Sequence, residues 1–171
     1  LLSPEKAIFW PKSSILIVSD IHLGKAGHFR KSGVAVPAHI HFGDLKRLSQ
    51  LIDRLQPKKI AFLGDLFHSD YNIDWDYFCD WIKKFPHIQF ILVQGNHDIL
   101  YKIDYQNAGI ELVDELKLDP FSFSHEKIKT DYYNISGHVH PSVRLKGLAR
   151  QGLNLPCFYF SKEHALLPAF G

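Results

Sequence analysis

The 171-residue sequence contains no methionine and only two cysteines, Cys79 and Cys157. Two cysteines make neither a disulfide framework nor a cysteine-rich zinc site, so we expect a reducing, cytoplasmic compartment. No apolar run approaches the length that spans a bilayer, and the first residues lack the pattern of a signal peptide. We therefore expect no membrane association. Because residue 1 is not methionine, we also expect the natural product to be longer.

Strong net charge, internal repeats and low-complexity tracts are also missing. The formal net charge is +2 and the pI is about 8.5, which is too mild to indicate nucleic-acid binding, although a local basic patch remains compatible with it. A hydrophobic content of 46% over this length is enough for one sizeable core. We expect a single domain over residues 1–171.

Short apolar runs alternate with amphipathic segments along the chain. Apolar residues at helical spacing predict one helix between Pro37 and Pro57 and another from about Asp74 to Pro86. The final third of the chain returns to strand patterns. The apolar runs predict buried strands over residues 7–10, 14–19, 59–64, 88–94, 121–124 and 132–136. These patterns predict an α/β protein with a central mixed sheet, or a two-sheet sandwich, flanked by helices.

Histidine is abundant, with 11 residues, and six of them stand just after predicted strands. Ligands of open α/β sheets bind beyond the carboxyl ends of the strands, so clusters placed there can meet in space. Each cluster alone is as well explained by a turn or a helix cap. Their shared position favours a common site. The clusters are Asp20 and His22; Asp65 and His68; Asn96, His97 and Asp98; His125 and Glu126; and His138 and His140.

The residue types in these clusters are those of a metal centre. Carboxylates, one amide oxygen and several imidazoles suit Mn²⁺, Fe or Zn²⁺ better than Ca²⁺ or Mg²⁺, which favour oxygen ligands. Two divalent ions with Asp20, Asp65 and a bridging hydroxide carry a net positive charge that attracts a phosphodiester. The sequence therefore favours phosphate chemistry.

Two local features support this interpretation. Glycine directly precedes three of the clusters, at positions 64, 95 and 137, where it lets the backbone approach a ligand closely. In extended backbone, residues i and i+2 point to the same side, so we expect Asp20 to face the same way as His22. The same spacing predicts that His138 and His140 share one direction.

The clusters, taken in order, resemble the motif set of the calcineurin-like metallophosphoesterases. The matching motifs are Asp20-x-His22, Gly64-Asp65-x-x-His68, Gly95-Asn96-His97-Asp98, His125-Glu126 and Gly137-His138-x-His140. The resemblance implies a four-layer α/β/β/α sandwich with mixed sheets and two bound divalent metal ions. It implies that Asp65 bridges the ions, one held with Asp20, His22 and His140, the other with Asn96, His125 and His138.

The same resemblance implies roles for the other polar residues. His97 would stabilise the transition state or protonate the leaving oxygen, and Asp98 would orient it through a hydrogen bond. His68 would face the phosphate. Basic side chains would contact a phosphate backbone, although an ordinary solvated surface explains them equally well. These bases are Lys25, Arg30, Lys31, Arg144, Lys146 and Arg150.

A narrower resemblance covers nearly the whole chain. Residues 20–37, 63–70, 137–147, the "LPCF" of 155–158 and the "LLPAFG" of 166–171 are similar to the DNA-ligase-associated metallophosphoesterases, a bacterial group linked to DNA repair. This similarity implies a DNA endonuclease that uses Mn²⁺, a functional link to DNA ligase and helicase repair proteins, and a homodimer. Lys127 departs from the pattern, in which proline follows His125-Glu126.

Two other functions remain open on the same centre. A phosphomonoesterase or a small-molecule nucleotide pyrophosphohydrolase would need the same ligands. A protein phosphatase is disfavoured because "GDLFHSD" and "GNHD" differ from the motifs of that branch. A non-catalytic scaffold is disfavoured because none of the ligand positions has been lost.

Overall fold

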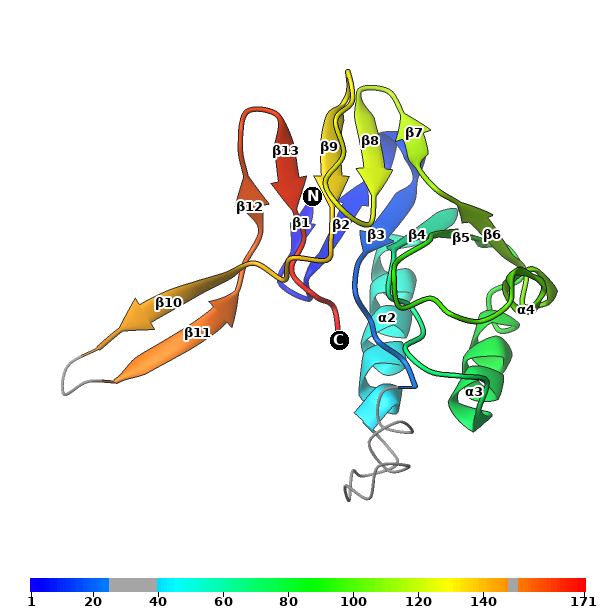
Figure 1. Cartoon of the computed structure of the whole chain (residues 1–171). Helices are drawn as coiled ribbons and strands as arrows, with labels where there is room; N and C mark the ends of the chain where they lie inside the picture. Colours follow the sequence, from blue (N-terminus) through cyan, green and yellow to red (C-terminus); the bar gives the residue numbers. More distant parts are fainter. Residues whose placement is uncertain (25–39, 148–150) are drawn as a thin grey trace.

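A computed structural model describes residues 1–24, 40–147 and 151–171 of the protein. Two β-sheets pack face to face, and helices cover the outer face of the larger sheet (Figure 1). The larger sheet runs in the order β1 (Leu2–Ser3), β2 (Ala7–Trp10), β3 (Ile15–Val18), β4 (Lys59–Leu63), β5 (Gln89–Val93), β6 (Ile110–Val113). The smaller sheet runs in the order β12 (Tyr159–Phe160), β13 (His164–Leu166), β9 (Tyr133–Ser136), β8 (Phe121–Ser124), β7 (Leu116–Leu118). Both sheets are mixed, as expected.

The helices follow the predicted pattern with small shifts. Helix α2 (Ile40–Leu55) buries Leu45, Leu48 and Ile52, as their spacing predicted. Helix α3 (Ile73–Ile82) begins earlier than expected, because the Asn72 side chain, and not Asp74, caps it by accepting a hydrogen bond from the Asp74 amide. The 3-10 helix η1 (Pro11–Ser13) and helix α4 (Lys102–Asn107) are too short for a clear periodic signal. Among the described residues, none of the helices is long and apolar enough to cross a membrane.

The central strands are buried on both faces, which explains their continuous apolar runs. In β3, Leu16 and Val18 face the helices, while Ile15 and Ile17 face the smaller sheet. The core between the sheets is completed by Phe123 from β8 and by residues of β9 and β13. Strands β3 to β6 are parallel, so their carboxyl ends meet at one edge of the larger sheet.

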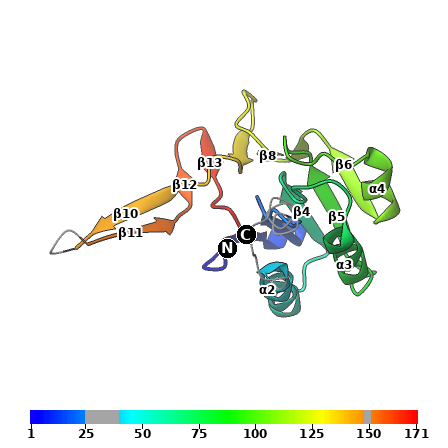
Figure 2. The same ribbon diagram turned by 60° about the horizontal axis from the view of Figure 1, so that its bottom comes forward.

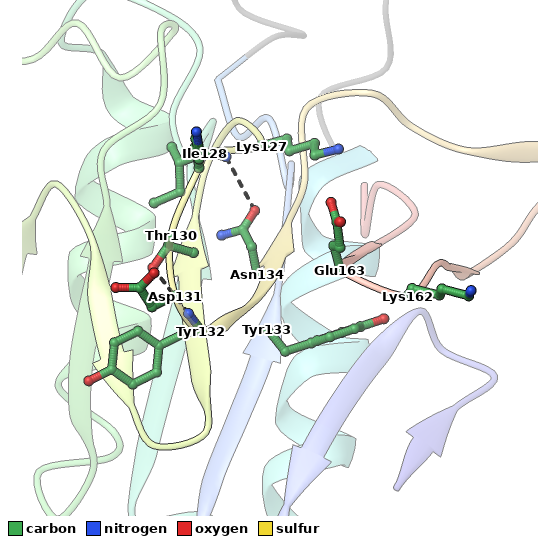
Figure 3. A pocket seen from close by; sticks show the side chains of 10 residues that line it. Lys127, Ile128, Thr130, Asp131, Tyr132, Tyr133, Asn134, Lys162 and Glu163 are labelled. Atoms are coloured by element: carbon green, nitrogen blue, oxygen red, sulfur yellow. Dashed lines mark hydrogen bonds between the residues drawn. The ribbon is translucent and has the colours of Figure 1, made fainter.

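The sandwich of two mixed sheets is as expected, and in the described part of the chain the outer face of the smaller sheet is covered by a loop. Residues 125–132 form the loop that connects β8 to the parallel strand β9 (Figure 1), and the described helices pack on the larger sheet. The buried Asn134 side chain ties the loop down by accepting a hydrogen bond from the Ile128 amide at 3.3 Å (Figure 3). A cavity of about 720 Å³ lies beside the loop, and none of its lining residues belongs to the predicted site.

A separate ribbon of β10 (Ser142–Lys146) and β11 (Gly152–Pro156) projects away from the two sheets (Figures 1 and 2). The register pairs Val143 with Leu155 and Leu145 with Leu153, so one face is aliphatic. Arg144, paired with Asn154, lies on the other face. All residues of both strands are exposed. The alternating pattern of this segment was expected, but its separation from both sheets was not.

Candidate metal centre

The loops after β3 and β4 continue to pair beyond the ends of the strands. The Asp20 amide donates to the Gly64 carbonyl at 3.2 Å, and the His22 amide donates to the Asp65 carbonyl at 2.9 Å. Leu23 then forms an isolated parallel bridge with Phe67. This extension of the parallel pairing places the first two polar clusters side by side.

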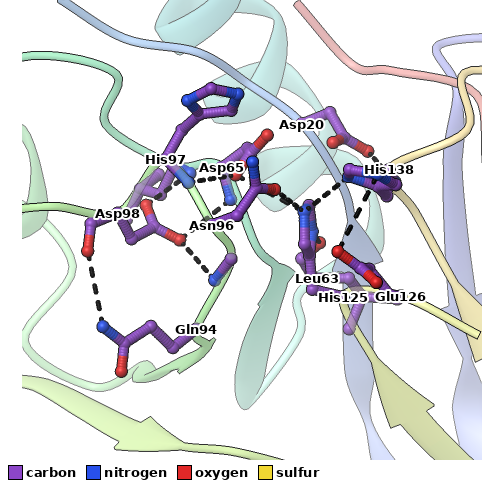
Figure 4. A network of polar contacts seen from close by, with 12 residues as sticks. Asp20, Leu63, Asp65, Gln94, Asn96, His97, Asp98, His125, Glu126 and His138 are labelled. Atoms are coloured by element: carbon purple, nitrogen blue, oxygen red, sulfur yellow. Dashed lines mark hydrogen bonds and ion pairs between the residues drawn. The ribbon is translucent and has the colours of Figure 1, made fainter. Parts of the chain in front are cut away.

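The predicted ligand side chains form two neighbouring groups. Asp20, His22 and His140 make the first, and within it the potential ligand atoms all lie within 4.8 Å of one another. Asp65, His125 and His138 make the second by the same measure (Figure 4). Both sheets contribute, because His125 follows β8 and His138 follows β9.

Asp65 lies between the two groups. Its Oδ1 is 3.5 Å from Nε2 of His125, and its Oδ2 is 4.0 Å from Nδ1 of His22. Each carboxylate oxygen therefore faces a different group. Asn96 joins the second group through its Oδ1, which is 2.9 Å from Nε2 of His125. The structure thus brings all seven predicted metal-binding side chains to one place.

The centre buries two carboxylates beside histidine rings. Asp20 is fully buried and Asp65 is 2% exposed. The Asp20 oxygens contact the His138 amide at 3.0 Å and Nε2 of His140 at 3.1 Å. Two buried negative charges are costly unless cationic partners compensate them. A carboxylate and imidazole donor set with this buried charge fits divalent transition-metal ions.

The backbone of the ligand residues is left-handed. Asp20, His22, Asp65, His138 and His140 have φ angles between 51° and 63°, a region that side chains other than glycine rarely adopt. The expected extended geometry is therefore wrong at these positions. Asp20 and His22 nevertheless join one group, as expected, whereas His138 and His140 join different groups, as the family resemblance implied. Left-handed backbone concentrated at one site is typical of functional sites.

Two of the predicted glycines are required by close contact between ligand loops. A Cβ atom on Gly64, whose φ is +78°, would lie 2.1 Å from Nδ1 of His125. A Cβ atom on Gly137 would lie 2.4 Å from Oδ2 of Asp20. At these two positions glycine therefore leaves space for a metal-binding side chain of the neighbouring loop. The sequence had instead indicated that glycine leaves space for a bound substrate or ion.

Replacing Gly137 by alanine is expected to displace the Asp20 carboxylate and weaken Mn²⁺ binding at least about tenfold, as loss of ligand support commonly does. Isothermal titration calorimetry with Mn²⁺ measures the change. Gly43→Ala is the matched control, because its added methyl group meets no atom within 4 Å and should stabilise helix α2. Unchanged Mn²⁺ affinity in Gly137→Ala would contradict the steric argument.

His97 and His68 lie together beside the first group. Their rings stack with centroids 3.9 Å apart and an interplanar angle of 25°. The His22 ring is 5.4 Å from that of His68 and 6.3 Å from that of His97. The His97 backbone amide also donates to Oδ1 of Asp65 at 3.0 Å. His97 is thereby fixed against the shared carboxylate.

Asp98 has a different role from the one expected. Its carboxylate accepts hydrogen bonds from the amides of Asp65, Leu66, Phe67 and Gly95 at 2.8–3.2 Å. The His97 ring points away from this carboxylate (Figure 4). Burial raises the pKa of Asp98 to about 6, against the lowering effect of these hydrogen bonds. Asp98 thus joins the loop after β4 to the loop after β5 and does not orient the imidazole.

Only some of the bases predicted to contact a phosphate backbone lie among the described residues. Lys25 and Arg30, like Lys31 and Arg150, lie outside the described residues. Arg144 and Lys146 are exposed on the projecting ribbon. Glu126, to which the sequence assigned no role, has an Oε1 atom 3.9 Å from Nε2 of His138.

Comparison with known proteins agrees with this geometry. Residues 13–159 match the family described as calcineurin-like phosphoesterase. The chain is similar to the crystal structure of the Pseudomonas putida nuclease MPE, with 31% identity and a TM-score of 0.82 over 98% of this chain and 80% of that chain. It also resembles in fold a protein of unknown function, AQ665, from Aquifex aeolicus, with 20% identity and a TM-score of 0.52 over 74% of this chain and 78% of that one. No curated protein matches the sequence.

Proposed function

The chain belongs to the calcineurin-like phosphoesterase family and is a metal-dependent phosphoesterase, and from this we propose that it is a two-metal phosphodiesterase that cleaves DNA. The observation that carries the proposal is the position of Asp65, with one oxygen toward each of two ligand groups. Similarity to a nuclease over 98% of the chain supports nucleic acid as the substrate class.

The proposed ligands follow the two groups. Asp65 would be shared by the two ions. Asp20, His22 and His140 would hold one ion, and Asn96, His125 and His138 would hold the other. Mn²⁺ is the proposed metal, because it accepts carboxylate, amide and imidazole ligands together. When bound, two divalent ions lower the pKa of water and neutralise phosphate charge.

His97 is the proposed general acid. It lies beside the first ligand group and is partly exposed, so its ring can meet a bound phosphodiester. Stacking on the His68 ring fixes the orientation of the His97 ring, and the Asp65 carboxylate accepts a hydrogen bond from the His97 backbone amide. In this arrangement His97 donates a proton to the leaving oxygen. His68, stacked on the His97 ring, faces the phosphate.

The ribbon provides a second contact region for a long substrate. Strand β10 begins two residues after His140, so a polymer held at the metals passes close to the base of the ribbon. Arg144 and Lys146 carry positive charge on its exposed surface and would contact backbone phosphates, together with Lys25 and Arg30. A role in DNA repair in the cytoplasm belongs to the same proposal. The link to DNA ligase and helicase proteins and a homodimer stay predictions.

A metal-by-substrate panel tests the proposal. We expect hydrolysis of bis(p-nitrophenyl) phosphate and of DNA in Mn²⁺, and little turnover of the monoester p-nitrophenyl phosphate. Single-stranded, duplex and hairpin DNA and matched RNA strands define the polymer that is cleaved, and products resolved on gels separate internal from terminal cuts. Activity confined to monoesters or to nucleotide pyrophosphates would overturn the proposal in favour of those alternatives.

A further inference from the structure

The "LLPAFG" segment at the end of the chain crosses the ends of both sheets next to the ligand loops. The Leu167 amide donates to the Ser136 carbonyl at 2.8 Å, and Ser136 directly precedes Gly137 and His138. The Phe170 amide donates to the Ser19 carbonyl at 2.8 Å. Figure 1 shows this segment leaving β13 and running toward the loop after β3 and helix α2. We call residues 167–171 the strap.

The strap is anchored in both hydrophobic cores. Leu167 is fully buried between the sheets, and Phe170 is fully buried in the core under the helices. The hydroxyl of Ser19 donates to the Pro168 carbonyl at 3.4 Å. Anchors on two sides fix the position of the strap between the sheets.

The strap also holds the backbone of Asp20 directly. The Gly171 amide donates to the Asp20 carbonyl at 3.2 Å, while the Asp20 amide is bound by the Gly64 carbonyl on the other side. A Cβ atom on Gly171 would lie 2.1 Å from the Ile21 carbonyl oxygen, so only glycine permits this approach. Both peptide groups of a residue in left-handed backbone are thus restrained.

Arg47 of helix α2 clamps the strap from the outside. Its guanidinium donates to the Phe170 carbonyl and lies over the Phe170 ring, 4.2 Å from the centroid. The same group donates to Asp44 at 2.8 Å, which holds the arginine side chain in place. Arg47 therefore links helix α2 to the segment that binds the Asp20 loop.

We propose that the strap, clamped by Arg47, is a positioning device that holds Asp20 in its ligand conformation and fixes its distance from the His138 loop. Arg47 and Phe170 are positioning residues, because they act on the metal centre only through the strap. This proposal rests on the proposed function, in which Asp20 is a ligand. Because Arg47 holds the Phe170 end of the strap, next to Asp20, releasing the clamp lowers metal affinity more at the group of Asp20, His22 and His140 than at the group of Asp65, His125 and His138.

The test compares two arginines of the same helix. Mn²⁺ binding is titrated by electron paramagnetic resonance and calorimetry, which resolve two sites, in Arg47→Met, Arg47→Lys, Gly171→Ala and the wild type. Arg54→Met is the matched control, because Arg54 bonds Glu5 and Ser3 and makes none of the strap contacts. We expect Arg47→Met and Gly171→Ala to weaken one of the two sites about tenfold or more. Arg47→Lys should restore much of the affinity, and Arg54→Met should leave both sites unchanged.

Asp20→Ala separates the two proposals. Unchanged Mn²⁺ binding in Asp20→Ala would overturn the ligand assignment itself. Loss of one site in Asp20→Ala, with wild-type affinity in Arg47→Met and Gly171→Ala, would overturn the strap alone. Equal weakening of both sites in Arg47→Met would also overturn it, because general destabilisation does not select one site. Thermal unfolding of each metal-free variant shows whether that variant is folded. If Arg47→Met does not fold, Gly171→Ala provides the same test.

Discussion

Asp65→Asn is expected to abolish phosphodiester hydrolysis while leaving the metal-free protein at least as stable as the wild type. Both effects come from the same carboxylate. Asp65 is 2% exposed and faces both ligand groups, so its charge is needed by two ions and is poorly compensated without them. Asparagine keeps an oxygen for the His97 amide but removes the buried charge, and with it a cost to the folded state.

Two measurements check this expectation. Turnover of bis(p-nitrophenyl) phosphate in Mn²⁺ should fall by about 10³-fold or more, which corresponds to the several kcal/mol that metal ions contribute to the transition state. The melting temperature without metal should stay level or rise, and the increase that Mn²⁺ gives to the wild type should be lost. Asp53→Asn, on the exposed side of helix α2, is the control and should behave as wild type. Wild-type activity in Asp65→Asn would exclude the shared-ligand assignment.

His97→Ala is expected to affect substrates according to their leaving groups. A general acid is needed most where the departing oxygen is strongly basic, as in the sugar alkoxide of DNA. The p-nitrophenolate ion leaves without a proton. We therefore expect loss of DNA cleavage by about 10²- to 10⁴-fold, the usual contribution of a general acid, and less than about a tenfold loss for bis(p-nitrophenyl) phosphate.

The stack between His97 and His68 provides a second comparison. Because the rings lie 3.9 Å apart, His68→Ala should impair DNA cleavage in the same direction by releasing the His97 ring. The double variant should then lose less than the product of the two single losses, since neighbouring residues acting together are not additive. His87→Ala, outside the predicted site, serves as the control. Equal losses of His97→Ala on both substrates would argue against proton donation and for a role in phosphate binding.

Much of the fold and of the candidate site can be predicted from the sequence. Strands β3, β4 and β5 are apolar on both faces and lie within one or two residues of their expected limits, because burial on two sides leaves a continuous apolar run. The polar clusters follow strand ends, and the fold brings them together as parallel strands require. Short elements such as β6, β7 and α4 were missed, since a few residues carry little periodic signal.

The sequence by itself determined the strand and helix pattern, the identity of the candidate ligands and their convergence, because hydrophobic periodicity and residue chemistry are local properties of the chain. Only the tertiary structure decided that Asp98 binds loop amides and that the strap holds Asp20. These features depend on left-handed backbone and on hydrogen bonds between segments far apart in the chain. No local pattern encodes such partners, because packing of the two sheets selects them.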